Sequence, residues 1–166
     1  MLNVLRSRLN KDEEDGFTLI ELMVVVLIIA ILIAIAIPTF LGARSRSQER
    51  AAQSSARNAV TAAKTMYTDD GNYDAADDSA TGLSTVEPSL TYSAAATPSA
   101  DEKTVSVSGA GDTFAAAVMS DSGTCYLVRD NASSTGGGTF FGETGTAANC
   151  TGTFAATPAN TAGNEW

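Results

Sequence analysis

An uninterrupted apolar run constrains the fold of this chain more than any other feature of the sequence. From Leu22 to Ile37, sixteen consecutive residues carry no polar side chain. As an α-helix that rises about 1.5 Å per residue, this run and its flanks cross much of a hydrocarbon layer about 30 Å thick. The sequence therefore predicts a membrane-spanning helix over residues 17–42.

Glu21 is the one ionisable residue between Phe17 and Ile37. A carboxylate is costly in hydrocarbon, and charged groups in such segments usually have a partner. In one interpretation Glu21 reaches the nearby membrane face, because it lies only one helical turn from the apolar boundary. In the other it pairs with a cation. The acid taken alone does not decide between the two interpretations.

Residues 1–16 are charged and polar and end in Gly16. A secretory signal has its small cleavage residue after its apolar core, whereas here the small residue precedes the apolar run. Cleavage at Gly16 would leave the apolar segment on the mature chain. Basic residues balance across the span, with Arg6, Arg8 and Lys11 before it and Arg44, Arg46 and Arg50 after it. Charge therefore does not orient the chain.

The helix is expected to continue beyond the span. Pro38 would bend or loosen it, or is simply a proline tolerated near a membrane boundary, and Gly42 adds flexibility. Residues 43–68 are rich in good helix formers and carry one apolar face at helical spacing: Ala52, Ala56, Ala59, Val60, Ala63, Met66 and Tyr67. Gly71 suits the position after the helix end. We expect the apolar face to pack against a sheet.

Short strands are predicted after an irregular connection over residues 69–103, in which a short turn is expected near Leu83–Leu90. The strand-like pieces are Thr104–Ser108, Thr113–Met119, Thr124–Arg129 and Thr139–Gly142, with turns at 109–111 and 121–123 and a loop at 131–138. Residues 155–166 are expected to be a polar tail. The fold class is α+β, in two layers: a long N-terminal helix packed by its second half against a small antiparallel sheet.

Cys125 and Cys150 are the only cysteines. Their loop-rich, Gly/Thr/Ser-rich surroundings favour an exported, oxidising environment and a disulfide, with buried free thiols as the alternative. Together with the sheet-like distal region, they lead us to place the N-terminus in the cytoplasm.

The run from Gly16 to Leu22, Gly-Phe-Thr-Leu-Ile-Glu-Leu, followed by an apolar helix with Pro38, resembles the processing motif of type IV prepilins and pseudopilins. The resemblance covers residues 16 to about 45, and the rest matches only in its pilin-like architecture. It implies a leader of residues 1–16, a transmembrane or filament-core helix over 17–42 and a head over 43–166.

In that family a membrane-embedded prepilin peptidase would cut after Gly16 and N-methylate Phe17. The resulting amine keeps its charge, and Glu21 of a neighbouring copy can pair with it in an apolar core. The resemblance further implies a helical homopolymer built by an assembly machine with an ATPase. The precursor would lie in the inner membrane and the assembled pilus on the cell surface.

Other activities find less support in the residues. Histidine is absent, so the commonest general base and metal ligand is missing, and we expect no catalytic role, no metal and no cofactor. The acidic residues at 70–78 lack the glycine and the closing glutamate of a calcium loop. Acids greatly outnumber Lys103 and Arg129 after residue 65, which disfavours nucleic-acid binding by the head. Two glycosylation sequons, at Asn131 and Asn149, are patterns common by chance.

Two rival functions stay open at this point. Within the family, the chain could be a pseudopilin or minor pilin of a secretion or DNA-uptake system. Outside it, the chain could be a single-span adhesin or receptor. The basic residues between Arg44 and Arg57 could be a solvated face, contact anionic lipids, or meet the acidic heads of neighbouring copies.

Overall fold

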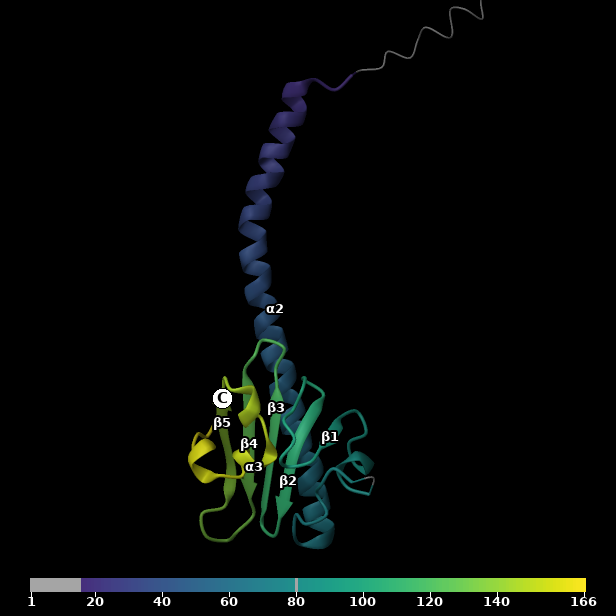
Figure 1. Ribbon diagram of the computed structural model, residues 1–166, viewed down its shortest axis with the longest axis vertical. Helices are drawn as coiled ribbons and strands as arrows, with labels where there is room; N and C mark the ends of the chain where they lie inside the picture. Colours follow the sequence, from purple (N-terminus) through teal and green to yellow (C-terminus); the bar gives the residue numbers. More distant parts are fainter. Residues whose placement is uncertain (1–15, 80) are drawn as a thin grey trace, which may run out of the picture. The chain divides into compact units, whose positions relative to one another are not determined.

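The computed structural model describes residues 16–79 and 81–166. Its contacts divide the chain into two compact units, one up to Gly42 and one over Ala43–Trp166. Helix α2, Leu19–Asp70, contributes to both units (Figure 1). The predicted α+β architecture, with a long helix packed by its second half against a small, mostly antiparallel sheet, is confirmed.

In the first unit α2 stays helical through Pro38 and Gly42. Proline has no N–H, so the carbonyl of Ala34 receives no helical hydrogen bond from residue 38. One residue on, the Thr39 hydroxyl donates to the carbonyls of Ala36, at 2.9 Å, and Ile35, at 3.3 Å. Such back-bonding accommodates slight bending. The expected kink at Pro38 and Gly42 stays a prediction.

In the second unit α2 buries the predicted apolar stripe. Ala52, Ala56, Ala59 and Ala63 are fully buried, and Met66 and Tyr67 are packed at the edge of the same cluster. Because four of these side chains are alanine, the helix backbone can approach the sheet closely. Val105, Phe114, Val118 and Val128 supply the larger apolar groups from the sheet side.

The sheet has five strands in the order β1-β2-β3-β4-β5. They are β1 Thr91–Ser93, β2 Thr104–Ala110, β3 Thr113–Met119, β4 Cys125–Asn131 and β5 Gly138–Thr144. Strands β2 to β5 form the expected antiparallel meander. The predicted turn at 109–111 is shifted, because Gly109 and Ala110 pair within β2–β3 and leave a two-residue loop at Gly111–Asp112.

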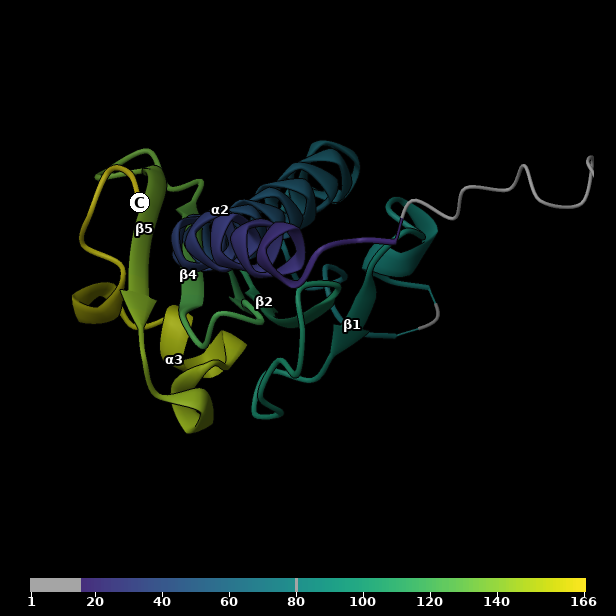
Figure 2. The same ribbon diagram turned by 90° about the horizontal axis from the view of Figure 1, so that it is seen from above.

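A second core covers the other face of the sheet. Ala115, Ala117, Cys125 and Leu127 point to this face and pack against Ala155 of the short helix α3, Gly152–Ala155. Figure 2 shows the second half of α2 on one side of the sheet and α3 on the other. The prediction of a two-layer head was therefore incomplete. Successive residues of β3 and β4 point to opposite faces of the sheet, and both sets are buried.

The segment between α2 and β2 holds more structure than expected. α2 ends at Asp70, and Gly71 follows with φ of +73° and donates its N–H to the Tyr67 carbonyl at 2.8 Å, as a glycine after a helix end should. The connection contains η1, Leu83–Thr85, near the expected turn, and also β1, which pairs parallel to β2. The irregular-loop expectation is wrong at β1.

The predicted polar tail is also wrong, because residues 155–166 pack on the sheet. After η2, Ala147–Asn149, and α3, the chain forms η3, Pro158–Asn160, and Gly163 bridges to Phe141 of β5. The Trp166 indole N–H donates to the carbonyls of Gly142, at 2.9 Å, and Leu127, at 3.1 Å. A side chain at Gly142 would collide with the Asn160 carbonyl, so only glycine permits this close approach.

Candidate assembly site

The N-terminus of α2 is closed by a reciprocal set of hydrogen bonds between Thr18 and Glu21. The Thr18 N–H and hydroxyl donate to Oε2 of Glu21 at 2.9 and 2.6 Å, and the Glu21 N–H donates to the Thr18 hydroxyl at 3.3 Å. This is a capping box, in which residues three positions apart satisfy each other's free backbone groups. It fixes the Glu21 carboxylate beside the helix start.

Both bonds from Thr18 end on the same carboxylate oxygen. The second oxygen, Oε1, accepts no hydrogen bond within the described part of the chain, so it is available to a donor from another molecule. Thr18 was not predicted from the sequence, although a Thr followed three residues later by Glu, just before an apolar run, is a readable signature of a capping box.

Phe17, the residue expected to become the mature N-terminus, precedes this cap and is 82% exposed. Phe17, Ile20, Glu21, Val24 and Val25 line one shallow groove. The acid and the predicted methylation position therefore share one surface. Gly16 lies before the helix, in no regular element, and is exposed. The rest of the expected leader, residues 1–15, lies outside the described residues.

Exposed apolar side chains cover α2 on all sides between Leu19 and Leu41. The large hydrophobic residues that are exposed in the described chain lie between Phe17 and Leu41, with Val86 as the only other member. By length and composition, α2 is the one helix of the described residues that could cross a membrane. Because the apolar part of α2 is not buried within the described chain, its composition indicates a segment that is anchored in a membrane or covered by protein.

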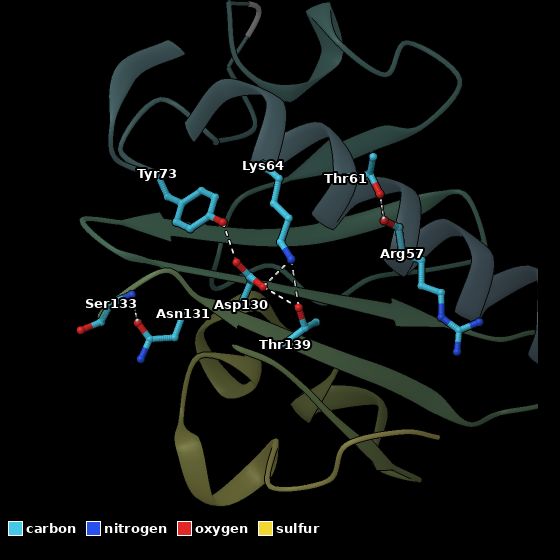
Figure 3. A network of polar contacts seen from close by, with 8 residues as sticks. All are labelled: Arg57, Thr61, Lys64, Tyr73, Asp130, Asn131, Ser133 and Thr139. Atoms are coloured by element: carbon cyan, nitrogen blue, oxygen red, sulfur yellow. Dashed lines mark hydrogen bonds and ion pairs between the residues drawn. The ribbon is translucent and has the colours of Figure 1, made fainter. Parts of the chain in front are cut away.

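The head carries its own polar centre around Asp130 of β4 (Figure 3). Asp130 is 4% exposed. Its Oδ1 lies 2.9 Å from Nζ of Lys64 and accepts the Thr139 hydroxyl at 2.6 Å. Its Oδ2 accepts the Tyr73 hydroxyl at 2.6 Å. The network ties α2, β4, β5 and the segment after α2 together.

Two opposing effects set the ionisation of Asp130. Burial alone raises the pKa of its carboxyl group. The three hydrogen bonds that it accepts, together with the ammonium charge of Lys64, outweigh burial and hold the pKa below its ordinary value. Burial and the adjacent carboxylate raise the pKa of Tyr73, so its hydroxyl stays protonated and donates.

The other residues singled out in the sequence lie elsewhere. Cys125, at the start of β4, and Cys150, after η2, form the expected disulfide, with their Cα atoms 5.6 Å apart. Among the acidic residues after α2, Asp74 accepts the Gly111 N–H at 2.7 Å and Asp77 accepts Ser79. Both therefore cap backbone groups within the head.

Comparison with known proteins adds one finding. A family model described as the prokaryotic N-terminal methylation motif matches residues 13–37. No curated protein matches the chain, and no solved structure matches it. The matched range contains Gly16, Phe17, Thr18 and Glu21, the same residues that form and flank the capping box.

Proposed function

We propose that the chain is a prepilin-type protein, as the motif at residues 13–37 indicates, and that it is the structural subunit of a type IV pilus-like surface filament. The observation that carries the proposal is the combination of this motif with an exposed stretch of α2, Leu19 to Ile37, that is apolar except for the Glu21 carboxylate near its start. The proposed role of the protein is assembly rather than catalysis.

Processing is the first step of the proposal. A prepilin peptidase cuts after Gly16 and methylates the new amine of Phe17. Glycine supports this role because it offers no side chain to obstruct an extended backbone in a protease groove. Methylation keeps the amine cationic, so each mature copy carries a positive charge at the start of an apolar helix.

Glu21 then supplies the matching negative charge for a neighbouring copy. Thr18 holds one carboxylate oxygen and leaves the other free, so the acid can accept a neighbour's ammonium without giving up its capping bonds. Such a pair sets the offset between adjacent helices, because a displaced register would leave both charges unpaired in an apolar core.

Membrane anchoring of the precursor fits the same helix. On leaving lipid for the filament core the helix exchanges one apolar environment for another, so burial alone provides little driving force. We therefore infer an ATP-driven assembly machine as a partner, with the precursor in the inner membrane and the filament on the cell surface. Helical head-to-tail contacts between copies do not close, and so produce an open fibre.

The direct test is the mass of the N-terminal peptide from sheared surface fibres. We expect a chain that begins at N-methylated Phe17. A fibre protein that still carries residues 1–16 would overturn the proposal. Replacing Gly16 with a bulky residue should trap the unprocessed precursor in the membrane, where immunoblotting detects its greater mass.

Glu21→Gln separates charge pairing from helix capping. Glutamine can still accept the capping bonds but cannot neutralise an amine, so the variant should be inserted and cleaved normally yet enter fibres roughly tenfold less. Thr18→Ala is the control, because it removes the capping hydroxyl and keeps the carboxylate. Equal fibre yields for Glu21→Gln and the wild-type chain would contradict the pairing.

The abundance of the subunit distinguishes a filament subunit from a pseudopilin or minor pilin. A major subunit should account for most of the protein in sheared fibres. A chain found there only in trace amounts would belong to the second class.

A further inference from the structure

Four basic residues of α2 form one line along the helix: Arg46, Arg50, Arg57 and Lys64. Their spacings of four, seven and seven residues place all four within about 40° of one another around the helix axis. We call this line the basic stripe. Arg44, by the same geometry, lies more than about 100° away from it.

Most charges of the basic stripe have no carboxylate partner within the head. Arg46, Arg50 and Arg57 are exposed. The ion pair found in the described residues joins Lys64 to Asp130 and involves none of the arginines. Arg57 instead lies over the Trp166 ring, 4.9 Å from its centroid. The stripe thus presents unpaired cations to solvent or to a partner.

The stripe faces the β5 side of the head. Lys64 contacts Thr139 of β5, and Trp166 under Arg57 packs edge-on against Phe141 of the same strand. Beside the stripe a hollow of about 260 Å³ is lined by residues that include Arg57, Thr61 and Phe141. A docked surface can therefore find apolar contact as well as charge there.

An acidic segment lies on the opposite side. Residues 71–103, which we call the acidic loop, contain six acids that are at least partly exposed, with Lys103 as the one basic residue: Asp74, Asp77, Asp78, Glu87, Asp101 and Glu102. η1, within this acidic loop, packs against β1, and β1 and β5 are the two edges of the sheet (Figures 1 and 2). The basic stripe and the acidic loop therefore occupy opposite flanks of one head.

We propose that the basic stripe is a docking surface for the acidic loop of a second copy of this chain. Complementary patches on opposite flanks cannot meet within one molecule, but they can meet between molecules in a contact that repeats without closing. Opposite charges across such a contact fix its register and exclude wrong alignments. The inference rests on the proposed function and names the head surface that each copy offers its neighbour.

Charge exchange in the full chain tests this contact in sheared fibres. Arg46→Glu with Arg50→Glu turns attraction into repulsion and should lower fibre yield roughly tenfold. Adding Asp78→Arg and Glu87→Arg to the same chain restores the complementarity with its sign inverted, and should return the yield to within about twofold of the wild-type level. None of these four changes removes an ion pair found within the described head.

Arg44→Glu is the matched control for single Arg50→Glu, since both arginines are exposed and lie on different sides of α2. Only Arg50→Glu should lower the yield. Equal losses of fibre yield for Arg44→Glu and Arg50→Glu would overturn the docking surface. So would a chain with all four substitutions that assembles no better than the chain with Arg46→Glu and Arg50→Glu alone. In both cases the wild-type chain still forms fibres, so the proposed function stands.

The docking surface would also be overturned if the chain with Arg46→Glu and Arg50→Glu forms fibres at the wild-type yield but no longer binds duplex DNA or anionic vesicles that the wild-type chain binds. If the wild-type chain forms no fibres, the proposed function itself is contradicted.

Discussion

At the scale of single residues, Asp130 concentrates the polar contacts of the head on one buried carboxylate. Its partners come from three other parts of the chain, so the ionised group joins elements that are distant in sequence. A buried carboxylate without them would be strongly disfavoured. Asp130 therefore makes the stability of the head depend on pH, in a direction that follows from its lowered pKa.

Because the pKa of Asp130 is lower in the folded than in the unfolded chain, its ionisation stabilises the fold above the ordinary Asp pKa of about 4. That stability is lost as the pH falls through the lower folded value. Asp130→Asn should reduce the free energy of unfolding at pH 7 by about 2 kcal/mol. As the pH falls below the ordinary Asp pKa of about 4, the difference between variant and wild type should shrink.

Urea unfolding of the head at a series of pH values measures this effect. Asp78→Asn is the control, because Asp78 is exposed and accepts no hydrogen bond found in the described head. A variant at Asp130 that stays equally stable at pH 7 would show that the network adds nothing to folding.

At the scale of elements, the disulfide holds the layer that carries α3. The core between that layer and the sheet includes four alanines, Ala115, Ala117, Ala155 and Ala156, each of which buries little apolar area. Cys150 lies two residues before α3, and the bond to Cys125 ties this segment to the first residue of β4. The covalent link therefore substitutes for part of a core that these small side chains cannot supply.

Cys125→Ser with Cys150→Ser should lower the free energy of unfolding by about 3.5 kcal/mol, the chain-entropy value for residues separated by 25 positions. Urea denaturation with and without reductant gives the measurement. Reductant should destabilise the wild-type head to the same extent and leave the double variant unaffected. If reductant does not shift the wild-type midpoint, the disulfide contributes no stability.

The same elements show which features of the fold could be predicted from the sequence. β3, Thr113–Met119, was predicted with its observed bounds because turn residues flank it on both sides. The buried stripe of α2 was predicted because helical periodicity is local information. β1 was missed because three residues show no periodicity and become a strand only by pairing with β2.

The candidate sites, like the strands, were predicted where the information is local and missed where it is not. Glu21 and Gly16 stand out because their spacing is encoded in a few adjacent residues. The hydrogen-bond network around Asp130 was not predicted, because its members lie up to 75 residues apart and no local sequence pattern indicates that they meet. The contact of Trp166 with β4 and β5 is equally non-local.

At the scale of the whole molecule, the two units differ in what they need around them. Both cores of the described chain are built from residues 52–155, whereas the exposed large apolar side chains between Phe17 and Leu41 belong to the other unit. The head therefore buries nearly all of its large apolar side chains within itself, whereas the first unit needs lipid or other copies of the chain to cover its own.

A chain that begins at Ala43 should accordingly fold, remain monomeric in solution and lose all capacity to form fibres. Near-ultraviolet circular dichroism would report the packed aromatic groups around Trp166, and size-exclusion chromatography the monomer. The docking surface is intact in this fragment, but exposed ion pairs are weak and screened by salt, so the head contacts alone should not hold copies together. Fibres formed by the isolated head would place the driving force of assembly in the head and not in the apolar helix.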